Sequence, residues 1–548
     1  MMDFNRLFLF LIFSMSMALL WDAWHRVDTP VVSVASPPQT LITPQSNIPV
    51  SKLATNKVNT SIESSQQQVL SSQIIKVKTD FLLAEINTLG GDLQQLEFLQ
   101  QRDAKDRSRP FILLQKKADH TYIAQSGLLG SDLPTHNTMF ASQFTEYALI
   151  EGKDTLEVRL TAQTTAGIKV TKIYLFRRAS YLIDILYEIE NNSINVVSPS
   201  AYFQFIRDKS VPEGGTIFVP TFTGPAIYTE ADKFEKFDFS EIEKGKIKLP
   251  SNIDNGWIGM LQHYFVAAWL PTGKTEREFY AKALDGGLYS TGVVLPVGDI
   301  TPGNIAKINM PLYVGPAQTS LDEIAPGLGL TVDYGWLTIF SIPLFSLLVF
   351  FYGWVSNWGV AIILLTVLIK IVFFPLSAAS YKSMGKMRVV APKLEKIKQM
   401  YGDDRERLHK AMMELYKTEK INPMGGCLPV LIQIPIFIAL YWAILASVEL
   451  RYAPFFGWIT DLSVADPYYI LPIIMGISMV VQGKLNPVPP DPFQAKLMQV
   501  MPIAFSIVFF FFPAGLVLYS VVNNILSIAQ QWYITRSLEA AAKGVVKS

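Results

Sequence analysis

The chain has 548 residues, half of them hydrophobic, and its 47 basic and 46 acidic residues leave a formal net charge of +1. Its mean hydropathy of +0.27 is too high for an ordinary soluble protein of this length. The near-zero net charge gives no indication that the protein binds nucleic acid or an acidic substrate. The single cysteine, Cys427, excludes an intrachain disulfide, and the scattered histidines form no zinc-ligand spacing.

The first residues predict a membrane anchor over residues 1–24. Arg6 precedes the apolar stretch Leu7–Trp21, and no small-residue cleavage site follows it. We interpret this segment as an uncleaved span with a cytoplasmic N-terminus, and a cleaved signal peptide is the alternative. Residues 25–72 are rich in Ser, Thr, Gln and Pro without an apolar period, which predicts a disordered tether.

Residues 73–326 have the composition of a soluble domain in which apolar and polar residues alternate. In Ile183–Ile189 every second residue is apolar, and the turn-like segment 177–180 separates it from the apolar run Ile173–Phe176. This pattern predicts a β-hairpin. The whole segment therefore predicts a large antiparallel β-sandwich, and its place after an inward-starting span puts it outside the inner membrane.

Residues 327–536 predict a membrane-embedded helical core. The apolar segment 333–354 contains Pro343 and is bracketed by aromatic residues, so we expect a helix lying along the outer membrane surface, with a full span as the alternative. Residues 537–548 are expected to form a short cytoplasmic tail. Further apolar segments are predicted to cross the membrane: 358–376, 428–446, 468–481, 497–512 and 514–532.

The charges of the connecting loops predict the orientation. Segment 381–420 is rich in Lys and Arg, whereas the only basic residue of loop 449–467 is Arg451. The positive-inside rule then puts the first segment in the cytoplasm and the second outside, with both termini cytoplasmic in a multi-pass protein of the bacterial inner membrane.

The basic segment 381–420 also has helical periodicity. Its apolar residues recur at spacings of three and four, Gly402 divides the pattern, Pro392 suits the first turn of the first helix, and Asp403 or Asp404 can cap the second. We therefore expect a cytoplasmic helical hairpin, with a solvated connector as the alternative. Its expected core residues are Leu394, Ile397, Tyr401, Leu408, Met412 and Leu415.

Lys370 is the most informative single residue, because it lies within the predicted span 358–376. A lysine at the centre of a membrane helix costs roughly 2.5–3.5 kcal/mol on insertion scales. Snorkelling toward the headgroups is one explanation. Thr366 lies one turn earlier on the same face, and no predicted span carries an acidic residue near its middle, so we favour a hydrated cavity. Other polar residues of the spans are Gln433, Tyr519, Ser520 and Asn523, which alternatively only hold helices together.

No catalytic motif is recognisable: the chain has no nucleophile elbow, no HExxH and no phosphate-binding glycine loop. We therefore expect neither an enzyme nor a cofactor or metal site. A secondary transporter using Lys370 would predict inverted repeats, and an envelope sensor with a ligand-binding outer domain would predict a cytoplasmic signalling domain. Neither feature is apparent, although both functions remain the alternatives.

Several motifs resemble the Gram-negative branch of the YidC/Alb/Oxa family of membrane protein insertases. The similarity extends from the first span to the last, and its motifs are specific when taken together. They are Gly90–Asp92, Gly256–Tyr264, Asp333–Trp336, Asn357–Gly359, Ser383–Arg388, Asn422–Pro429, Gln433–Pro435, Asp466–Leu471, Pro513–Tyr519 and Gln530–Gln531.

The resemblance implies an insertase and chaperone with a five-helix core and a groove open to the cytoplasm and to lipid. Lys370 would be the positive residue of the groove, where relatives usually carry arginine. Ser520 stands where a second tyrosine often follows Tyr519. The partners implied are nascent membrane proteins, the lipid bilayer and the Sec translocon. Ribosomes and targeting factors are possible partners, although a long basic tail is absent. The groove residues implied are Lys370, Thr366, Gln433, Tyr519, Ser520 and Asn523.

Overall fold

The computed structural model describes most of the β domain and of the helical core. The predicted anchor over 1–24 and nearly all of the predicted tether over 25–72 lie outside the described residues. The described ranges are 47–49, 51, 72–103, 106–210, 222–250, 252–402, 404–419, 428–486 and 492–546.

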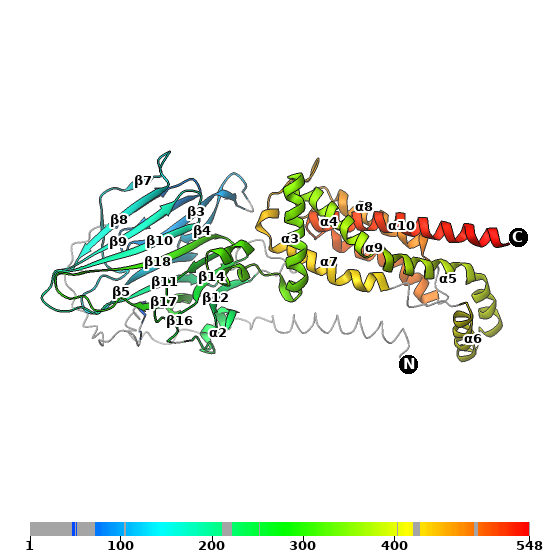
Figure 1. Ribbon diagram of the computed structural model, residues 1–548, viewed down its shortest axis with the longest axis horizontal. Helices are drawn as coiled ribbons and strands as arrows, with labels where there is room; N and C mark the ends of the chain where they lie inside the picture. Colours follow the sequence, from blue (N-terminus) through cyan, green and yellow to red (C-terminus); the bar gives the residue numbers. More distant parts are fainter. Residues whose placement is uncertain are drawn as a thin grey trace, which may run out of the picture. The chain divides into compact units, whose positions relative to one another are not determined.

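Two nine-stranded sheets form the β domain (Figure 1). Neighbouring strands are antiparallel, except that β1 and β7 are parallel. The first sheet has the order β16 (Glu278–Leu284), β17 (Leu288–Pro296), β11 (Ser200–Asp208), β5 (Thr121–Leu129), β4 (Pro110–Lys116), β3 (Asp92–Arg102), β2 (Leu82–Asn87), β1 (Ile74–Lys78) and β7 (Glu146–Ala148). The second has the order β13 (Lys233–Lys236), β12 (Thr223–Thr229), β14 (Trp257–Gln262), β15 (Phe265–Trp269), β18 (Ile305–Pro316), β10 (Leu182–Asn191), β9 (Ile168–Arg177), β8 (Thr155–Gln163) and β6 (Ala141–Ser142).

Alternation along the strands builds the core between the sheets. In β10 the side chains of Ile183, Ile185, Tyr187 and Ile189 are all buried. Ile183 pairs with Phe176 of β9 in an antiparallel register, which confirms the predicted hairpin. Because successive strand residues point to opposite faces, one face of each sheet supplies this core and the other remains available for separate contacts.

A buried polar group of opposite charges lies between the sheets. Lys172 and Asp92 are both almost fully buried, and the Lys172 ammonium donates to the Gly90 carbonyl at 3.1 Å. Gln125 donates to Asp92 at 2.8 Å. Burial raises the pKa of Asp92 and lowers that of Lys172, because desolvation disfavours both charged forms. The motif Gly90–Asp92 is therefore a structural part of the β domain.

We predict that residues 72–326 fold without the helical part. Their apolar core lies between two sheets, and burying it requires no membrane. The fragment should express as a soluble protein whose far-UV circular dichroism spectrum is dominated by β structure. An insoluble or helical product would contradict this prediction.

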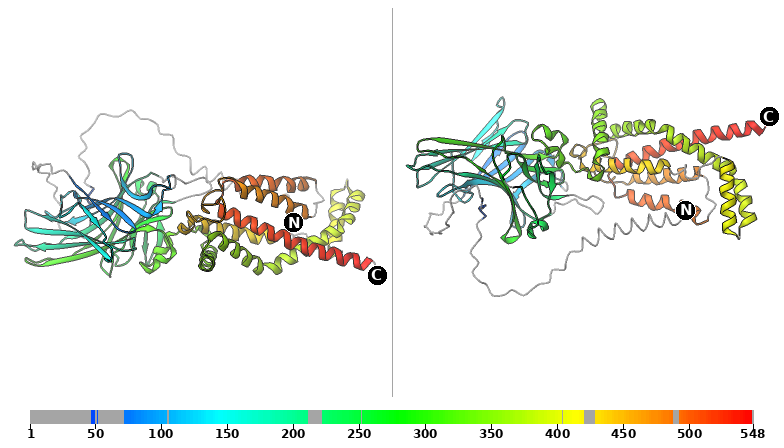
Figure 2. Two further views of the ribbon diagram at one scale, coloured as in Figure 1. Left: turned by 90° about the horizontal axis from the view of Figure 1, so that it is seen from above. Right: turned by 60° about the horizontal axis from the view of Figure 1, so that its bottom comes forward.

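The C-terminal part is helical. Helices α4, α7, α8, α9 and α10 form the five-helix core, and α5 and α6 extend from it (Figures 1 and 2). A further short helix, α2 (Phe239–Glu243), belongs to the β domain. The helices of this part are α3 (Thr338–Val355), α4 (Trp358–Val372), α5 (Phe374–Tyr401), α6 (Arg405–Thr418), α7 (Leu428–Ala446), α8 (Ile470–Leu485), α9 (Pro492–Phe509) and α10 (Ala514–Val546).

Helix α3 differs from the core helices in direction and exposure. It runs crosswise to α4, α7 and α10 (Figures 1 and 2). Among the described helices it alone is long and apolar enough to cross a membrane unbroken. Ile339 and Trp354 are 77% and 69% exposed, and Phe345 and Leu348 face the core. Its crosswise direction agrees with a helix at the membrane surface, and this placement stays a prediction.

The segment after Lys370 differs from the sequence-based expectation. Helix α4 ends at Val372, and α4 and the first part of α5 are bent by 66° at the break. Pro375, in the first turn of α5, explains the new start because proline suits that position and cannot continue a preceding helix. The expected helix start at Pro392 was wrong, since α5 continues through it. Helix α10 likewise continues to Val546, so most of segment 537–548 is helical.

Two of the sequence motifs hold loops against the core. Asn357 caps α4, and its Nδ2 donates to the Phe455 carbonyl at 3.0 Å. A Cβ atom at Gly359 would lie 2.0 Å from the Phe455 side chain, so only glycine allows this approach. The buried Asp466 accepts from the Leu471 amide at 2.8 Å and so fixes the start of α8.

Candidate substrate groove

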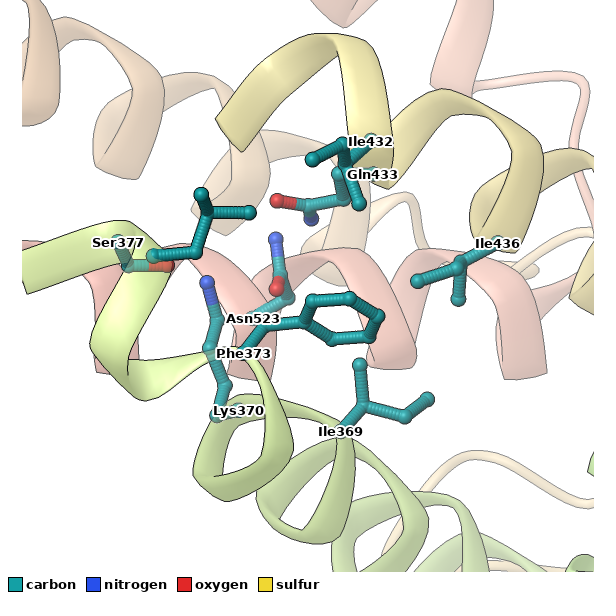
Figure 3. Close-up of a pocket in the computed structure, with 9 residues that line it drawn as sticks. Ile369, Lys370, Phe373, Ser377, Ile432, Gln433, Ile436 and Asn523 are labelled. Carbon is teal, nitrogen blue, oxygen red and sulfur yellow. The ribbon is translucent and has the colours of Figure 1, made fainter. Parts of the chain in front are cut away.

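A small cavity lies where α4, α5, α7 and α10 meet (Figure 3). Its volume of about 30 Å³ has room for water. Apolar side chains form most of the wall, and each of the four helices contributes one polar side chain. The lining residues are Ile369, Lys370, Phe373, Leu376, Ser377, Ile432, Gln433, Ile436 and Asn523.

Lys370 extends its ammonium group toward α10. The Nζ atom donates to Ser527 Oγ at 2.7 Å, and Ser527 in turn donates to the Asn523 carbonyl at 2.7 Å. None of the ion pairs between described residues involves Lys370. An ammonium group has three donors, so this contact leaves donors available for water or a substrate group.

The amides of Gln433 and Asn523 face the same space as the Lys370 ammonium (Figure 3). Tyr519 lies beside Gln433 and is 1% exposed. Its hydroxyl lies near the Gln433 side chain but makes no hydrogen bond of good geometry within the described part of the chain. A buried hydroxyl without a partner is costly, and a polar group brought by water or substrate would satisfy it.

Thr366 and Ser520 lie outside the lining of this cavity. Both are buried, and their hydroxyls donate to carbonyls of their own helices, Ile362 at 2.7 Å and Leu516 at 2.9 Å. Such bonds to the preceding turn satisfy the hydroxyl without a partner on another helix. The structure therefore brings Lys370, Gln433 and Asn523 together, with Tyr519 behind them, and leaves Thr366 and Ser520 in the helix packing.

Two polar residues of this region were missed by the sequence analysis. Ser527 accepts the hydrogen bond of Lys370, and Ser377 lines the cavity from the first turns of α5. Ser527 follows Asn523 by one helical turn, as Asn523 follows Tyr519. A search for polar residues at spacing four along α10 would have found it.

Comparison with known proteins decides the family. Residues 74–347 match the family described as YidC periplasmic domain, and residues 350–541 match the family described as 60Kd inner membrane protein. The chain belongs to the YidC family of membrane protein insertases. It is 51% identical to the membrane protein insertase YidC of Nitrosospira multiformis, covering 100% of this chain and 99% of that protein. The Methylobacillus flagellatus YidC is 53% identical over 99% of this chain and 98% of its own length.

A crystal structure of an active YidC insertase aligns with 84% of this chain and 93% of that chain, with a TM-score of 0.39 and 19% identity. The YidC relatives confirm the predicted fold class, an all-β periplasmic domain followed by a polytopic helical part, and the predicted function as an inner-membrane insertase rather than an enzyme.

The part of this YidC-family chain that follows the bend is a helical hairpin. Helices α5 and α6 are joined by a turn at Gly402. Of the two residues expected to cap α6, Asp403 and Asp404, it is Asp404 that accepts a hydrogen bond from the Arg407 amide, at 3.0 Å. The buried contact is made by Val390, Leu394 and Tyr416, with Met387, Met412, Met413 and Leu415 packed against them.

The hairpin core lies farther from the turn at Gly402 than the sequence predicted. Leu394, Met412 and Leu415 belong to it, whereas Ile397 and Leu408 are half-buried outside it. Tyr401 is 38% exposed, because it is the last residue of α5 and adjoins the turn at Gly402 that leads to α6. Helical spacing marks a shared face of a helix but not the part of that face that the partner helix covers.

Proposed function

We propose that this insertase moves polar extracytoplasmic segments of nascent membrane proteins part-way into the bilayer through a hydrated groove at Lys370. The observation that carries the proposal is a charged ammonium group beside a cavity with room for water, without a carboxylate partner among the described residues. A permanent ion pair would have neutralised this charge. A hydroxyl partner, Ser527, leaves the charge free to attract an acidic segment.

The other polar groups give the segment hydrogen bonds in place of those it loses to water. The amides of Gln433 and Asn523 line the cavity, and the Tyr519 hydroxyl makes no hydrogen bond of good geometry among the described residues. Each bond made there lowers the cost of burying a polar group, which is otherwise about 1–3 kcal/mol. The apolar span that follows then leaves the groove toward lipid, and the burial of its surface drives insertion.

Exposed apolar side chains next to Lys370 support a groove that opens toward lipid. Ile371 and Val372, next to Lys370 in the chain, are 64% and 63% exposed. Side chains of this kind, exposed beside a polar cavity, suit a boundary between groove and lipid. Insertion would thus need no closed channel.

The proposed topology follows the loop charges. Both termini and the hairpin of α5 and α6 would lie in the cytoplasm, and the β domain in the periplasm. The hairpin would receive the nascent chain. Its partners there would be ribosomes or targeting factors, and the Sec translocon would supply some substrates, as the family resemblance implies.

Thiol labelling tests the groove directly. In a Cys427→Ser background, a cysteine at 370 should react with a membrane-impermeant reagent added from the cytoplasmic side. Cysteines at Leu365, which is fully buried, and at Ile371, which is exposed toward the proposed lipid side, are the matched controls and should react severalfold more slowly. Equal reactivity at 370 and 371 would contradict a hydrated groove and favour a snorkelling lysine.

The same labelling in intact cells tests the topology. Ile194, in the β domain, is 91% exposed. The variant Ile194→Cys should therefore react with the impermeant reagent added outside the cells. His409, exposed on α6, should be protected until the inner membrane is permeabilised. Modification of position 409 in intact cells would reverse the proposed orientation.

A further inference from the structure

A second small apolar cluster lies on the face of the first sheet that points away from the sandwich core. Its buried members are Leu129 of β5, Tyr202 of β11, Tyr280 of β16 and Val294 of β17. Ile48, from the segment predicted to be a disordered tether, packs against this cluster. The next residue, Pro49, is buried. A short piece of the tether therefore lies on the β domain, far in sequence from the strands that it touches.

The sheet leaves room for this contact. Val294 pairs with Tyr202 on one side and Glu278 on the other, and Tyr280 pairs with Gly292. A Cβ atom at Gly292 would lie 2.7 Å from the Tyr280 hydroxyl, and one at Gly127 would lie 2.6 Å from the Tyr202 hydroxyl. The two glycines thus provide the space that the tyrosine side chains occupy. We call the surface on which Ile48 packs, together with Gln204 and Glu278 beside it, the Ile48 pocket.

The polar group at the base of the pocket is held in one orientation. The hydroxyls of Tyr280 and Ser290 both donate to Gln204 Oε1, at 2.8 and 2.9 Å. Gln204 Nε2 is thereby directed toward Gln125 Oε1 at 3.1 Å and toward the Asn47 backbone carbonyl at 3.4 Å. Because Gln204 is fully buried, its amide is a fixed donor for one peptide carbonyl.

A third contact lies at the rim. Ser51 Oγ donates to Glu278 Oε2 at 2.6 Å. The pocket therefore meets an apolar side chain, a backbone carbonyl and a hydroxyl of one short segment. An apolar pocket with a few placed polar groups is the usual composition of a ligand site, and contacts to backbone and to alternate side chains are typical of peptide recognition.

We propose that this pocket is a peptide-binding site of the β domain and that its resident ligand is the chain's own segment 47–51, through the described residues 47–49 and 51. The contact has a consequence for the tether. A chain spans at most about 3.4 Å per residue, so residues 25–72 together reach roughly 160 Å. Residues 25–46, which precede the bound segment, reach roughly 75 Å. Occupation of the pocket roughly halves the distance available between the predicted anchor and the β domain. This proposal is independent of the groove at Lys370.

Binding of a free peptide to the full chain tests the site. In one variant, residues 47–51 are replaced by a Gly-Ser sequence of equal length, which empties the pocket. The probe is a fluorescent peptide with the sequence of residues 45–53, and fluorescence anisotropy measures its binding. We expect saturable binding to this variant and at least about tenfold weaker binding to the unmodified chain, because a tethered ligand competes at high effective concentration.

Three controls define the contacts. The same replacement at residues 60–64 should leave binding as weak as in the unmodified chain. A probe carrying Ile48→Asp should not bind the emptied variant, and Glu278→Ala in that variant should weaken binding severalfold. Absence of saturable binding to the emptied variant, with an unchanged circular dichroism spectrum, would overturn the proposal. Equal binding to the emptied and unmodified chains would overturn it as well, since the tether would then not occupy the site.

Discussion

Lys370→Glu is expected to reduce the insertion of substrates with acidic extracytoplasmic segments by at least about tenfold. A charge pair at 4 Å is worth about 4 kcal/mol at an effective dielectric constant of 20, and the substitution turns attraction into repulsion. Substrates with neutral segments should lose much less. Insertion should be measured in a strain depleted of the native protein, with one reporter whose translocated segment is acidic and a second in which it is neutral.

Further substitutions at the same position separate charge from shape. Lys370→Arg should retain activity because the positive charge remains, although the planar guanidinium must find a different contact to Ser527. Lys370→Ala should lose activity severalfold, since Gln433 and Asn523 still line the cavity. Lys382→Glu, on the exposed face of α5, is the matched control and should act nearly normally. Near-normal insertion of acidic substrates by Lys370→Glu would exclude the charged-groove mechanism.

Loss of the hairpin of α5 and α6 is the second large expected effect. Deleting Lys393–Thr418 should abolish complementation of a depleted strain, while the protein still reaches the membrane. The reason is that the segment contributes Leu394 and Tyr416 to a small packed core, in which they meet Val390 of the remaining part of α5, and a docking element needs such a core. Growth of the depleted strain and the amount of protein in the membrane fraction are the two measurements.

Point substitutions test whether the packing of the hairpin, rather than its mere presence, matters. Leu394→Ala should cost about 2–5 kcal/mol of local stability, enough to separate α6 from α5 and to expose the segment to protease. Tyr401→Ala, at the exposed turn, is the control and should have little effect. Normal growth of the deletion would make the hairpin a simple connector.

The amino-acid sequence by itself determined the β domain and the helical core. Alternation in Ile183–Ile189 predicted strand β10 and its partner, and the apolar run 428–446 coincides with α7. These features depend on local periodicity and composition, which a single segment carries within itself. Lys370 was identifiable for the same reason, because a charge in an apolar run is costly wherever the helix lies.

The tertiary structure alone decided which polar residues meet. Thr366 and Lys370 share a helix face at spacing four, yet Thr366 bonds to its own helix and Lys370 reaches Ser527. The difference arises because a neighbouring helix packs against only part of the face that Thr366 and Lys370 share. Which part it contacts depends on residues more than a hundred positions away in the chain. The contact of Ile48 with β16 and β17 could not be predicted for the same reason. A pocket formed by distant strands leaves no periodic pattern in the sequence of the segment that binds to it.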